Sequence, residues 1–371
     1  MFNFWTHFVI KEICMKIEKI FKNKKIIVTG HTGFKGSWLT LSLKNLGAKV
    51  LGISSNIPTK PSNFLASKIN KDSRNIKLNI KKGEKIKKII NSFKPDFIFH
   101  LAAQALVSVS YKNPKETWDT NLIGTLNILE AVKKLKKKTT LIIITSDKAY
   151  KNVEKRAGYK ETDILAGIDP YSASKSSAEL AIQSYFSSFL INNKNINLGI
   201  ARAGNVIGGG DWSQDRLIPD CVRSWSKNKK VIIRNPNSTR PWQHVLEAVW
   251  AYILFAAKLN NNKTLNGQAF NFGPNLENNY SVAQLLHKMK KYWTNVNYVI
   301  KKSEKFYESK LLKLNCNKAR KYLGWKNHLS FEQNIQLTSE WYQNFYKNKK
   351  KIRSISINQI ENYKKKLLKR I

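Results

Sequence analysis

The chain has 371 residues, 42% of them hydrophobic and 11% aromatic, so it can build a sizeable core, and wholesale disorder is excluded. Sixty-six Lys and Arg residues against 24 Asp and Glu residues give a net charge of +42, but the excess is mostly Lys spread over the whole length together with Asn and Ile, which favours a solvated surface over a nucleic-acid-binding face. The three cysteines, Cys14, Cys221 and Cys316, lie far apart, which excludes a disulfide framework and a zinc ribbon and fits a reducing cytoplasm.

The N-terminal segment 1–21 is expected to be an extension of the fold. Its first ten residues are aromatic and apolar, but they have neither a basic leading region nor a small-residue cleavage site, so they do not read as a signal peptide. We hypothesise that the natural start is Met15 rather than Met1. No apolar run approaches the roughly 20 residues that span a bilayer, so we expect a cytoplasmic protein with no membrane partner.

From residue 26 onward, short apolar runs alternate with segments of helical periodicity. The expected strands are 26–28, 50–53, 76–80, 97–101, 141–145 and 198–201. One expected helix begins at Phe34, and three more lie over 86–93, 115–135 and 171–190. Because strands that are apolar throughout are buried on both faces, the pattern predicts an α/β fold, a doubly wound parallel Rossmann sheet.

The regular alternation of strands and helices ends after this series, where three consecutive glycines, 208–210, and several prolines separate shorter elements. We expect a Rossmann domain over 22–202, to which 244–272 returns. A smaller, mostly C-terminal substrate-binding domain would then consist of 203–243 and 273–346. The Lys- and Asn-rich segment 347–371 is expected to be a basic C-terminal tail, either a surface helix or frayed.

Three glycines, Gly30, Gly33 and Gly36, follow the first strand and open the first helix. Small residues there let the backbone approach a pyrophosphate, whose charge the free N–H groups of the helix N-terminus attract. A tight strand-to-helix turn without a ligand is the alternative. The acidic residue that usually binds the adenosine ribose is missing, because the second strand ends in Ser54 and Ser55. This segment therefore does not decide whether the cofactor is NAD or NADP.

Tyr171 and Lys175 are four residues apart and share one face of a helix that begins after Asp169 and Pro170. A nearby lysine charge is expected to lower the pKa of the tyrosine toward working pH, which makes the phenol a usable base. The spacing alone is weak evidence in so Lys-rich a chain. This copy, however, follows the fifth strand, where parallel strands end at a ligand crevice.

Ser146, Asp147 and Lys148 stand together at the carboxyl end of that fifth strand. A hydroxyl, a carboxyl and an amine in succession are suited to alcohol activation, acid catalysis and base catalysis. A polar loop after a strand explains any one of them, but it explains the three together much less well.

Motifs in chain order resemble the extended short-chain dehydrogenase/reductases over residues 22–346. They are segment 29–38, segment 100–104, Asn121 with Gly124 and Thr125, Tyr171 with Lys175, and segment 201–212. Within that superfamily, segment 146–148 together with segment 240–245 looks most like the CDP-glucose 4,6-dehydratase branch. The related dTDP-glucose dehydratases carry a glutamate where this chain has Lys148, which favours the CDP-sugar branch.

The resemblance implies an NAD-dependent lyase that converts CDP-glucose to CDP-4-dehydro-6-deoxy-glucose and water, for deoxysugar and surface-polysaccharide biosynthesis. NAD would be reduced and reoxidised within one turnover. Tyr171, with Lys175 and Ser146, would remove the proton of the 4-hydroxyl. Lys148, in its neutral form, would take the carbon 5 proton, and Asp147 would protonate the departing 6-hydroxyl.

The resemblance also implies binding residues, and no metal site is expected, because no carboxylate or cysteine is spaced to complete one with His31 or His244. The cofactor-binding set is Gly30, Thr32, Gly33, Phe34, Lys35, Gly36, Ser54, Asn79, Ile80, Ala102, Gln104, Asn121, Tyr171 and Lys175. The substrate-binding set is Gln104, Asn205, Arg216, Arg240 and His244. Asn79 stands where the family usually shows an aspartate, and His31 and His244 are more simply explained as structural residues.

Three alternative functions remain open, and the resemblance also implies an oligomeric state. A dTDP-glucose 4,6-dehydratase and a UDP-sugar 4-epimerase would use the same scaffold, although an epimerase does not need Asp147 and Lys148. A basic nucleic-acid-binding protein on a Rossmann scaffold is the alternative from another class. The family would further imply a homodimer through 115–135 and 171–190, with a nucleotide sugar as the small-molecule partner and no nucleic acid.

Overall fold

The computed structural model describes residues 17–293, 296–301 and 311–368, and its centre is a seven-stranded parallel sheet. The strands lie in the order β11-β6-β5-β4-β1-β2-β3. Their bounds are β1 Lys25–Thr29, β2 Lys49–Ser54, β3 Arg74–Lys77, β4 Phe97–His100, β5 Thr139–Ile144, β6 Ile196–Ala203 and β11 Ala269–Phe272. The expected doubly wound parallel sheet is confirmed. The hypothesis about Met1 and Met15 falls outside the described residues.

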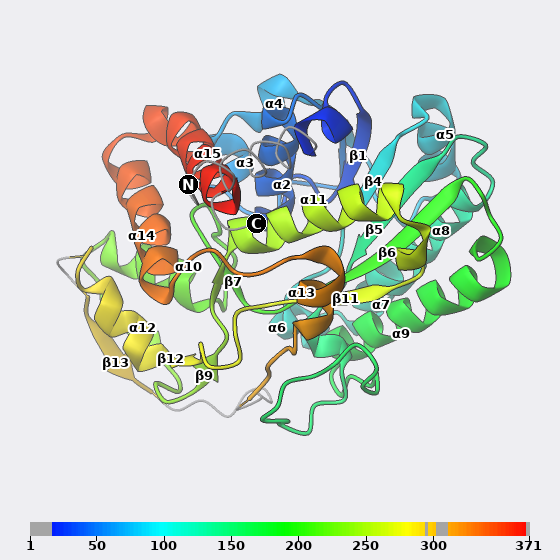
Figure 1. The fold of residues 1–371 in the computed structure, drawn as a ribbon. Helices are drawn as coiled ribbons and strands as arrows, with labels where there is room; N and C mark the ends of the chain where they lie inside the picture. The colour runs from blue at the N-terminus through cyan, green and yellow to red at the C-terminus, as the bar shows by residue number, and fades with distance from the viewer. Residues whose placement is uncertain (1–16, 294–295, 302–310, 369–371) are drawn as a thin grey trace, which may run out of the picture.

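Helices cover both faces of this sheet (Figure 1). Successive side chains of β1 explain why, because Ile26 and Val28 belong to one buried core and Ile27 to the other. The helices α2 (Phe34–Asn45) and α11 (Val245–Asn261) cover the first face. The second face is covered by α5 (Gly83–Phe93), α8 (Gly124–Lys133) and α9 (Pro170–Tyr185).

Short elements connect the larger ones. Between β2 and β6 these are α3 Asn63–Ala66, α4 Ile69–Asp72, α6 Val107–Lys112, α7 Pro114–Trp118, the π-helix η1 Asp119–Ile123, the 3-10 turn η2 Asp147–Ala149 and the π-helix η3 Phe186–Leu190. The single helix expected over 115–135 is therefore α7, η1 and α8 in succession, and that expected over 171–190 is α9 followed by η3.

A region of small elements follows β6. It contains β7 Val206–Ile207, α10 Leu217–Trp225, β8 Val231–Ile233, β9 Thr239–Arg240, β10 Gln243–His244, the 3-10 turn η4 Lys263–Leu265, β12 Tyr280–Ser281, α12 Val282–Met289, β13 Tyr298–Ile300 and α13 Asn317–Leu323. The strands pair two by two, β10 with β7, β12 with β9 and β13 with β8. The strand β11 interrupts this region and joins the sheet beside β6. The boundaries between domains stay a prediction.

The described part of the C-terminal segment is packed against the rest of the chain, so of the two forms expected for it, a surface helix and a frayed tail, the structure shows a helix with one buried side. The helix α14 (Phe331–Lys347) is followed by the 3-10 turn η5 Lys349–Lys351 and by α15 (Ile352–Leu368). Ile352, Ile360 and Tyr363 of α15 are buried in the core. The Tyr363 hydroxyl donates a 2.7 Å hydrogen bond to Glu247 of α11, and Lys364 forms an ion pair with Glu18 near the start of the described chain.

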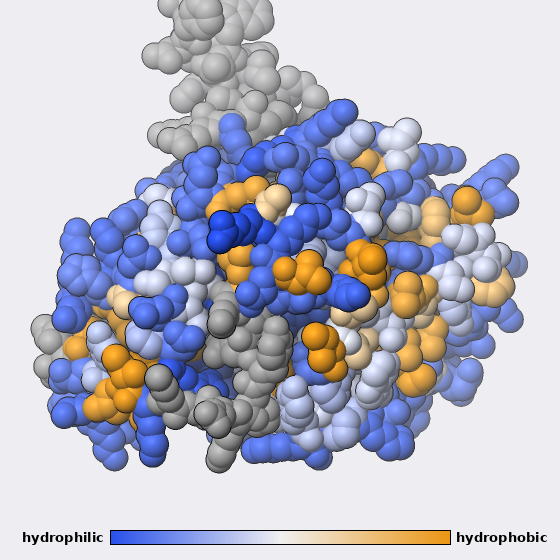
Figure 2. Space-filling model, turned by 90° about the horizontal axis from the view of Figure 1, so that it is seen from below, coloured by the Kyte–Doolittle hydropathy of each residue, from blue (hydrophilic) through white to orange (hydrophobic). Residues whose placement is uncertain are grey.

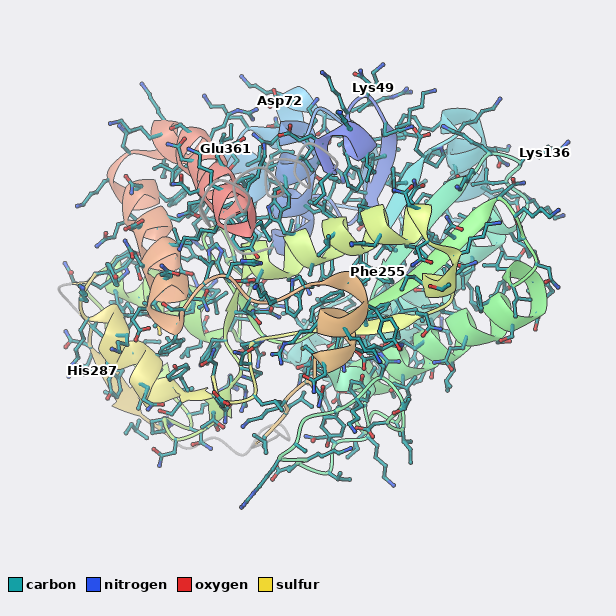
Figure 3. The ribbon with its side chains drawn as sticks, in the orientation of Figure 1. Lys49, Asp72, Lys136, Phe255, His287 and Glu361 are labelled. Atoms are coloured by element: carbon teal, nitrogen blue, oxygen red, sulfur yellow. The ribbon has the colours of Figure 1, made fainter. Side chains whose placement is uncertain are left out.

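The lysine excess is distributed over the surface. Lys49 and Lys136 are both exposed and point outward from distant parts of the molecule (Figure 3). On the face shown in Figure 2, hydrophilic residues predominate and hydrophobic side chains form separate groups. None of the described helices is long and apolar enough to cross a membrane.

Candidate active site

The glycines of the β1–α2 loop bring the backbone close to the loop that follows β4. Gly30 has a φ of 73°, a conformation that favours glycine, and a Cβ there would lie 2.7 Å from the backbone nitrogen of Ala102. A Cβ on Gly36 would overlap the carbonyl oxygen of Gly30. The helix α2 begins directly after Gly33, so its free N–H groups face this loop. The result is a backbone cradle for an anion, which we call the glycine cradle.

A chain of buried hydrogen bonds holds the strand ends beside the glycine cradle. Thr29 Oγ1 is 2.8 Å from His100 Nδ1, and His100 Nε2 is 3.2 Å from Thr125 Oγ1. Burial and then the charge of Lys175 lower the pKa of His100 to about 3, so its ring stays neutral. The sequence analysis used His100 only as part of a matching motif and missed this role.

The predicted acid–base segment lies where β5 ends. Ser146 Oγ donates a 3.0 Å hydrogen bond to Asp147 Oδ1 and accepts one of 3.2 Å from the Lys148 backbone nitrogen. Asp147 is buried, with 5% of the residue exposed. Burial raises the pKa of its carboxyl, although Lys148, Ser146 and Lys35 act in the opposite direction. A raised pKa keeps more of Asp147 protonated, as an acid catalyst requires.

The predicted base pair lies on the first turns of α9. Asp169 caps this helix by accepting hydrogen bonds of 3.0 Å from the backbone nitrogens of Tyr171 and Ser172. Tyr171 and Lys175 are both buried. The side chain of Ser146 acts on the Tyr171 hydroxyl and lowers its pKa, so the structure brings the two predicted segments together.

One expectation about this pair is wrong. Burial raises the pKa of Tyr171, and Ser146 and Arg216 act in the opposite direction. Lys175 itself is buried, and that burial together with the charge of Lys35 lowers its pKa to about 8, while Glu179 acts to raise it. Desolvation therefore outweighs the expected lysine effect in this site, and Tyr171 is a neutral phenol at pH 7.

Two cations complete the site. Lys35 of α2 is half-buried, and its pKa is lowered to about 8 by burial and by the charge of Arg216, against the effect of Asp147. Arg216 lies beside Asp211, with 3.1 Å between Nη1 and Oδ2. Lys35 thus acts on Asp147 and Arg216 acts on Tyr171, so positive charge lies beside the predicted acid and the phenol, which suits a ligand that carries phosphates.

The remaining predicted cofactor-binding residues have local structural partners. Thr32 Oγ1 donates a 2.6 Å hydrogen bond to the Asn56 carbonyl, and Ser54 Oγ forms a 2.9 Å hydrogen bond with His31 Nδ1. Asn79 Oδ1 accepts a 3.0 Å bond from the Lys81 backbone, and Ile80 is buried in the core. Phe34 is partly buried and packs against the core that contains Ile26 and Val28. The backbone N–H of Ala102 donates a hydrogen bond to Thr29 Oγ1. Asn121 joins Gln104 to Ser174 through hydrogen bonds of 2.8 to 3.1 Å.

The predicted substrate-binding residues are placed differently from one another. The side-chain amide of Gln104 donates to the Leu106 carbonyl and to Thr117, and Asn205 is half-buried directly after Gly204. Arg240 lies in β9, where its guanidinium donates to the Thr239 carbonyl. His244 is fully buried and caps α11, because its Nδ1 accepts a 3.3 Å hydrogen bond from the Leu246 backbone. His31 and His244 thus both have structural partners.

An ion pair behind Lys175 was missed by the sequence analysis. Glu179 and Arg202 are both buried, and Arg202 Nε lies 2.8 and 2.9 Å from the two carboxylate oxygens. Thr145 Oγ1 donates a further 2.6 Å hydrogen bond to Glu179. The available signal was the spacing, since Glu179 lies one helical turn after Lys175.

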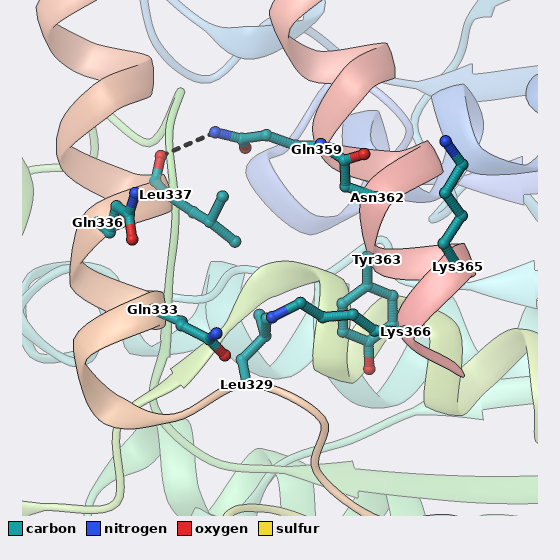
Figure 4. A pocket seen from close by; sticks show the side chains of 9 residues that line it. All are labelled: Leu329, Gln333, Gln336, Leu337, Gln359, Asn362, Tyr363, Lys365 and Lys366. Atoms are coloured by element: carbon teal, nitrogen blue, oxygen red, sulfur yellow. Dashed lines mark hydrogen bonds between the residues drawn. The ribbon is translucent and has the colours of Figure 1, made fainter. Parts of the chain in front are cut away.

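A pocket of about 340 Å³ lies elsewhere, between α14 and α15 (Figure 4). It is lined by Leu329, Gln333, Gln336, Leu337, Gln359, Asn362, Tyr363, Lys365 and Lys366. None of the predicted site residues lines it. In the described part of the chain, no group of three or more His, Cys, Asp or Glu side chains is arranged to hold a metal ion.

Comparison with known proteins places this geometry in context. The family model described as GDP-mannose 4,6 dehydratase matches residues 27–338. The chain is 42% identical over 333 residues to the CDP-glucose 4,6-dehydratase of Salmonella typhimurium strain LT2, covering 88% of this chain and 93% of the relative.

Two solved structures show the same fold. An epimerase of Methanothermobacter thermautotrophicus superposes with a TM-score of 0.79 at 21% identity, over 91% of this chain and 97% of that one. The dTDP-glucose 4,6-dehydratase of Bacillus anthracis, solved in complex with NAD, has a TM-score of 0.73 at 24% identity, over 90% of this chain and 99% of that one.

Proposed function

Because the chain belongs to the GDP-mannose 4,6 dehydratase family, we propose that it is an NAD-dependent hydro-lyase that converts CDP-glucose to CDP-4-dehydro-6-deoxy-glucose and water. The observation that carries this proposal is the 42% identity to a CDP-glucose 4,6-dehydratase over 88% of the chain. The effect of Ser146 on the pKa of Tyr171 supports it, because this effect places the acid–base segment beside the phenol.

The site fits NAD on its own geometry. The glycine cradle would be filled by a Cβ at Gly30 or Gly36, so its shape suits a pyrophosphate approaching the backbone. Gly30, Gly33 and Gly36 would hold the pyrophosphate, with Ala102 on the loop after β4 and Asn121 in η1 nearby. When bound, NAD would supply the oxidation at sugar carbon 4 and the matching reduction at carbon 6.

The first task of the protein's own residues is to activate the 4-hydroxyl. Tyr171, a neutral phenol at rest, would first give its own proton to Lys175 in its neutral form, and the resulting phenolate, beside Ser146, would accept the proton of the 4-hydroxyl. Arg216 favours the phenolate electrostatically, while Lys175, with its pKa lowered to about 8, can pass a proton on near neutral pH. The oxidised carbon 4 then acidifies the hydrogen on carbon 5.

The second task is the loss of water. Lys148 would remove the carbon 5 proton, and the electron pair of that C–H bond would form the double bond between carbons 5 and 6. The bond from carbon 6 to oxygen breaks, and Asp147 donates its proton to the leaving hydroxyl, which departs as water. The raised pKa of Asp147 supports the acid role.

The charges around the site support a nucleotide-activated sugar as substrate. Lys35 and Arg216 lie next to Asp147 and Tyr171, where a diphosphate would be stabilised. Asn205 and Arg240 are the further residues that we propose for the diphosphate and the nucleotide. The reaction would supply deoxysugars for a surface polysaccharide, and we propose the cytoplasm as its place.

We also propose a homodimer through the helices of residues 115–135 and 171–190. Exposed hydrophobic side chains support this surface, since Ile123, Leu180 and Phe189 are 43%, 53% and 50% exposed. Burying such a patch between two copies would be favourable. Sedimentation of the wild type and of Leu180→Glu tests it, because a monomeric wild type would contradict the proposal.

Incubation with CDP-glucose, dTDP-glucose and UDP-glucose, with and without added NAD, tests the function. The product is followed by the absorbance of the 4-keto sugar in alkali and by the mass loss of one water. Product from CDP-glucose alone is expected. Product from another nucleotide would overturn the substrate, mass-neutral conversion would mean an epimerase, and no turnover with salt-sensitive RNA binding would favour a binding protein.

A further inference from the structure

The ion pair of Glu179 and Arg202 lies behind the candidate active site, and both side chains are fully buried. Two charges are costly to withdraw from water, and apolar side chains of similar volume often give equal or greater stability. The pair is therefore weak evidence for a purely stabilising role. Its further hydrogen bonds lead to the two ends of the turn η2, which contains the predicted acid and the predicted base.

The carboxylate of this pair holds the start of the turn. Thr145, the residue directly before Ser146, donates a 2.6 Å hydrogen bond from Oγ1 to Glu179 Oε1. Glu179 lies on α9, one helical turn after Lys175 and two turns after Tyr171. One carboxylate thus joins the end of β5 to the helix that carries the phenol and the amine of the site.

The guanidinium of the pair holds the other end of the same turn. Arg202 Nη1 donates a 2.6 Å hydrogen bond to the hydroxyl of Tyr150, the residue on which η2 ends. The guanidinium also lies over the Tyr150 ring, with 4.8 Å between Cζ and the ring centroid. The Tyr150 hydroxyl in turn donates a 2.8 Å hydrogen bond to Asn271 Oδ1 of β11. The end of η2 is therefore tied to both β6 and β11.

The turn between these two ends is short. It consists of Asp147–Ala149 only, so fixing the residues before and after it fixes where its side chains begin. A third bond ties it directly to α9, because Ser176 Oγ donates a 2.8 Å hydrogen bond to the Ala149 carbonyl. Ser176 follows Lys175, so the turn and the predicted base pair are joined on both sides of the ion pair.

Glu179 also acts on Lys175 through its charge. Burial and the charge of Lys35 on α2 lower the pKa of Lys175 to about 8, and Glu179 acts in the opposite direction. His100 of β4 lies beside Lys175 as a neutral ring. Arg202 Nε contacts both carboxylate oxygens of Glu179, at 2.9 and 2.8 Å, and so holds this charge in one place.

We propose that Glu179 and Arg202 are positioning residues for the reaction, which fix the turn η2 against α9 and hold a carboxylate beside Lys175. The proposal rests on the proposed function, which assigns the proton transfers to segment 146–148 and to Tyr171. Proton transfer requires groups within hydrogen-bond reach, so a displaced turn slows the reaction even when the substrate still binds.

The variants Tyr150→Phe and Thr145→Val each remove one of the two bonds and leave the ion pair in place. In Tyr150→Phe, Arg202 Nη1 keeps its 3.1 Å bond to the Glu161 carbonyl, and the ring can keep its stacking on Tyr159. Each variant is expected to lower kcat about 10-fold, with KM for CDP-glucose and the affinity for NAD within about 2-fold of the wild type. The kcat of the wild type in both variants would overturn the proposal.

The matched control is Tyr159→Phe. Tyr159 is buried, and its ring stacks on that of Tyr150 with 5.1 Å between the centroids. Its hydroxyl, however, donates a 2.9 Å hydrogen bond to Asn152 and accepts one of 2.7 Å from the Val153 backbone. Its loss should lower the melting temperature and leave kcat unchanged. An equal fall of kcat in Tyr159→Phe would mean that these bonds act through stability alone, which contradicts a positioning role.

Glu179→Gln gives a readout that a merely structural role would not move. Lys175 must be neutral to take the proton of Tyr171, and Glu179 acts to raise the pKa of Lys175. The acid limb of the kcat profile is therefore expected to move at least about 0.5 pH unit downward. A limb that stays in place would overturn the role of Glu179. The two variants of Tyr150 and Thr145 carry the test if Glu179→Gln does not fold.

Amide hydrogen exchange separates a failure of this proposal from a failure of the proposed function, because it needs no turnover. Exchange in segment 146–149 is followed by mass spectrometry in the wild type, Tyr150→Phe and Tyr159→Phe. It is expected to be about 10-fold faster in Tyr150→Phe alone, since the released turn opens more easily. Unchanged exchange there would overturn the positioning role even if CDP-glucose is the substrate. Faster exchange in a protein that does not convert CDP-glucose would support that role and overturn only the proposed function.

Discussion

The substitution Gly204→Ala tests whether the position of Asp147 controls the reaction. Gly204 follows β6, and a Cβ there would lie 2.8 Å from Asp147 Oδ2 and 3.4 Å from its Cγ. Ordinary contacts begin at 3.4 Å, so the carboxylate oxygen must move by about 0.6 Å. The φ of Gly204 is not in the left-handed region, so alanine can adopt the same backbone conformation.

The size of the effect follows from this displacement. A misplacement of about 1 Å can cost roughly 100-fold in rate, so a shift of about 0.6 Å is expected to lower kcat about 10-fold, which is about 1.4 kcal/mol of barrier. The fold is expected to change little in stability. Overpacking costs about 1 kcal/mol, and the stiffer unfolded chain gives back about half of that.

The assay measures kcat and KM for 4-keto product formation from CDP-glucose, with the melting temperature recorded beside them. The matched control is Gly273→Ala, because a Cβ at Gly273 meets no atom closer than 3.7 Å and should leave kcat unchanged. A Gly204→Ala enzyme with the kcat of the wild type, or a loss confined to KM, would refute the reasoning that Asp147 must be held in place for the elimination.

Of three other substitutions, one tests the glycine cradle and two test the stability of the surrounding fold. Gly36→Ala should weaken NAD binding at least about 10-fold by calorimetry, because its Cβ overlaps the Gly30 carbonyl; unchanged affinity would argue against the glycine cradle. Burial raises the pKa of Glu247 to about 7, so the protein should lose stability as the pH rises from about 4.5 to 7, and Glu247→Gln should flatten that slope in melting curves. Ser330→Ala should cost about 1 kcal/mol in urea unfolding, because it removes the capping box of α14; no loss would contradict that cap.

The strands of the sheet could be predicted from the sequence because their hydrophobic pattern is strong. Strands such as β5 are buried at every position, so a run of apolar residues is both their signal and their physical cause. Strands of two residues, such as β7 and β10, have no periodicity to detect, since their pairing depends on the folded loops around them. For segment 347–371 the sequence left a surface helix and a frayed tail open, because the Lys and Asn content obscures the helical spacing of Ile352, Ile360 and Tyr363, which are buried in the structure.

The candidate site divides in the same way. The sequence was enough to predict that the segments containing Ser146 and Tyr171 lie together, because parallel strands end at one edge of a sheet. The raised pKa of Tyr171 could not be predicted, because it depends on how deeply the phenol is buried, which no spacing reveals. Glu179 and Arg202 come from a helix and a strand that meet only in the folded chain.

The helix α15 also sets the order in which this protein can be completed during translation. It connects the two ends of the described chain, because Arg353 donates a 2.8 Å hydrogen bond to the Ser67 carbonyl and Lys364 pairs with Glu18. On a ribosome, α2 emerges well before α15, the helix that packs against it. The surface of α2 that α15 covers therefore stays open to solvent until α15 has been synthesised, and a chain cut short before residue 352 would leave that surface uncovered.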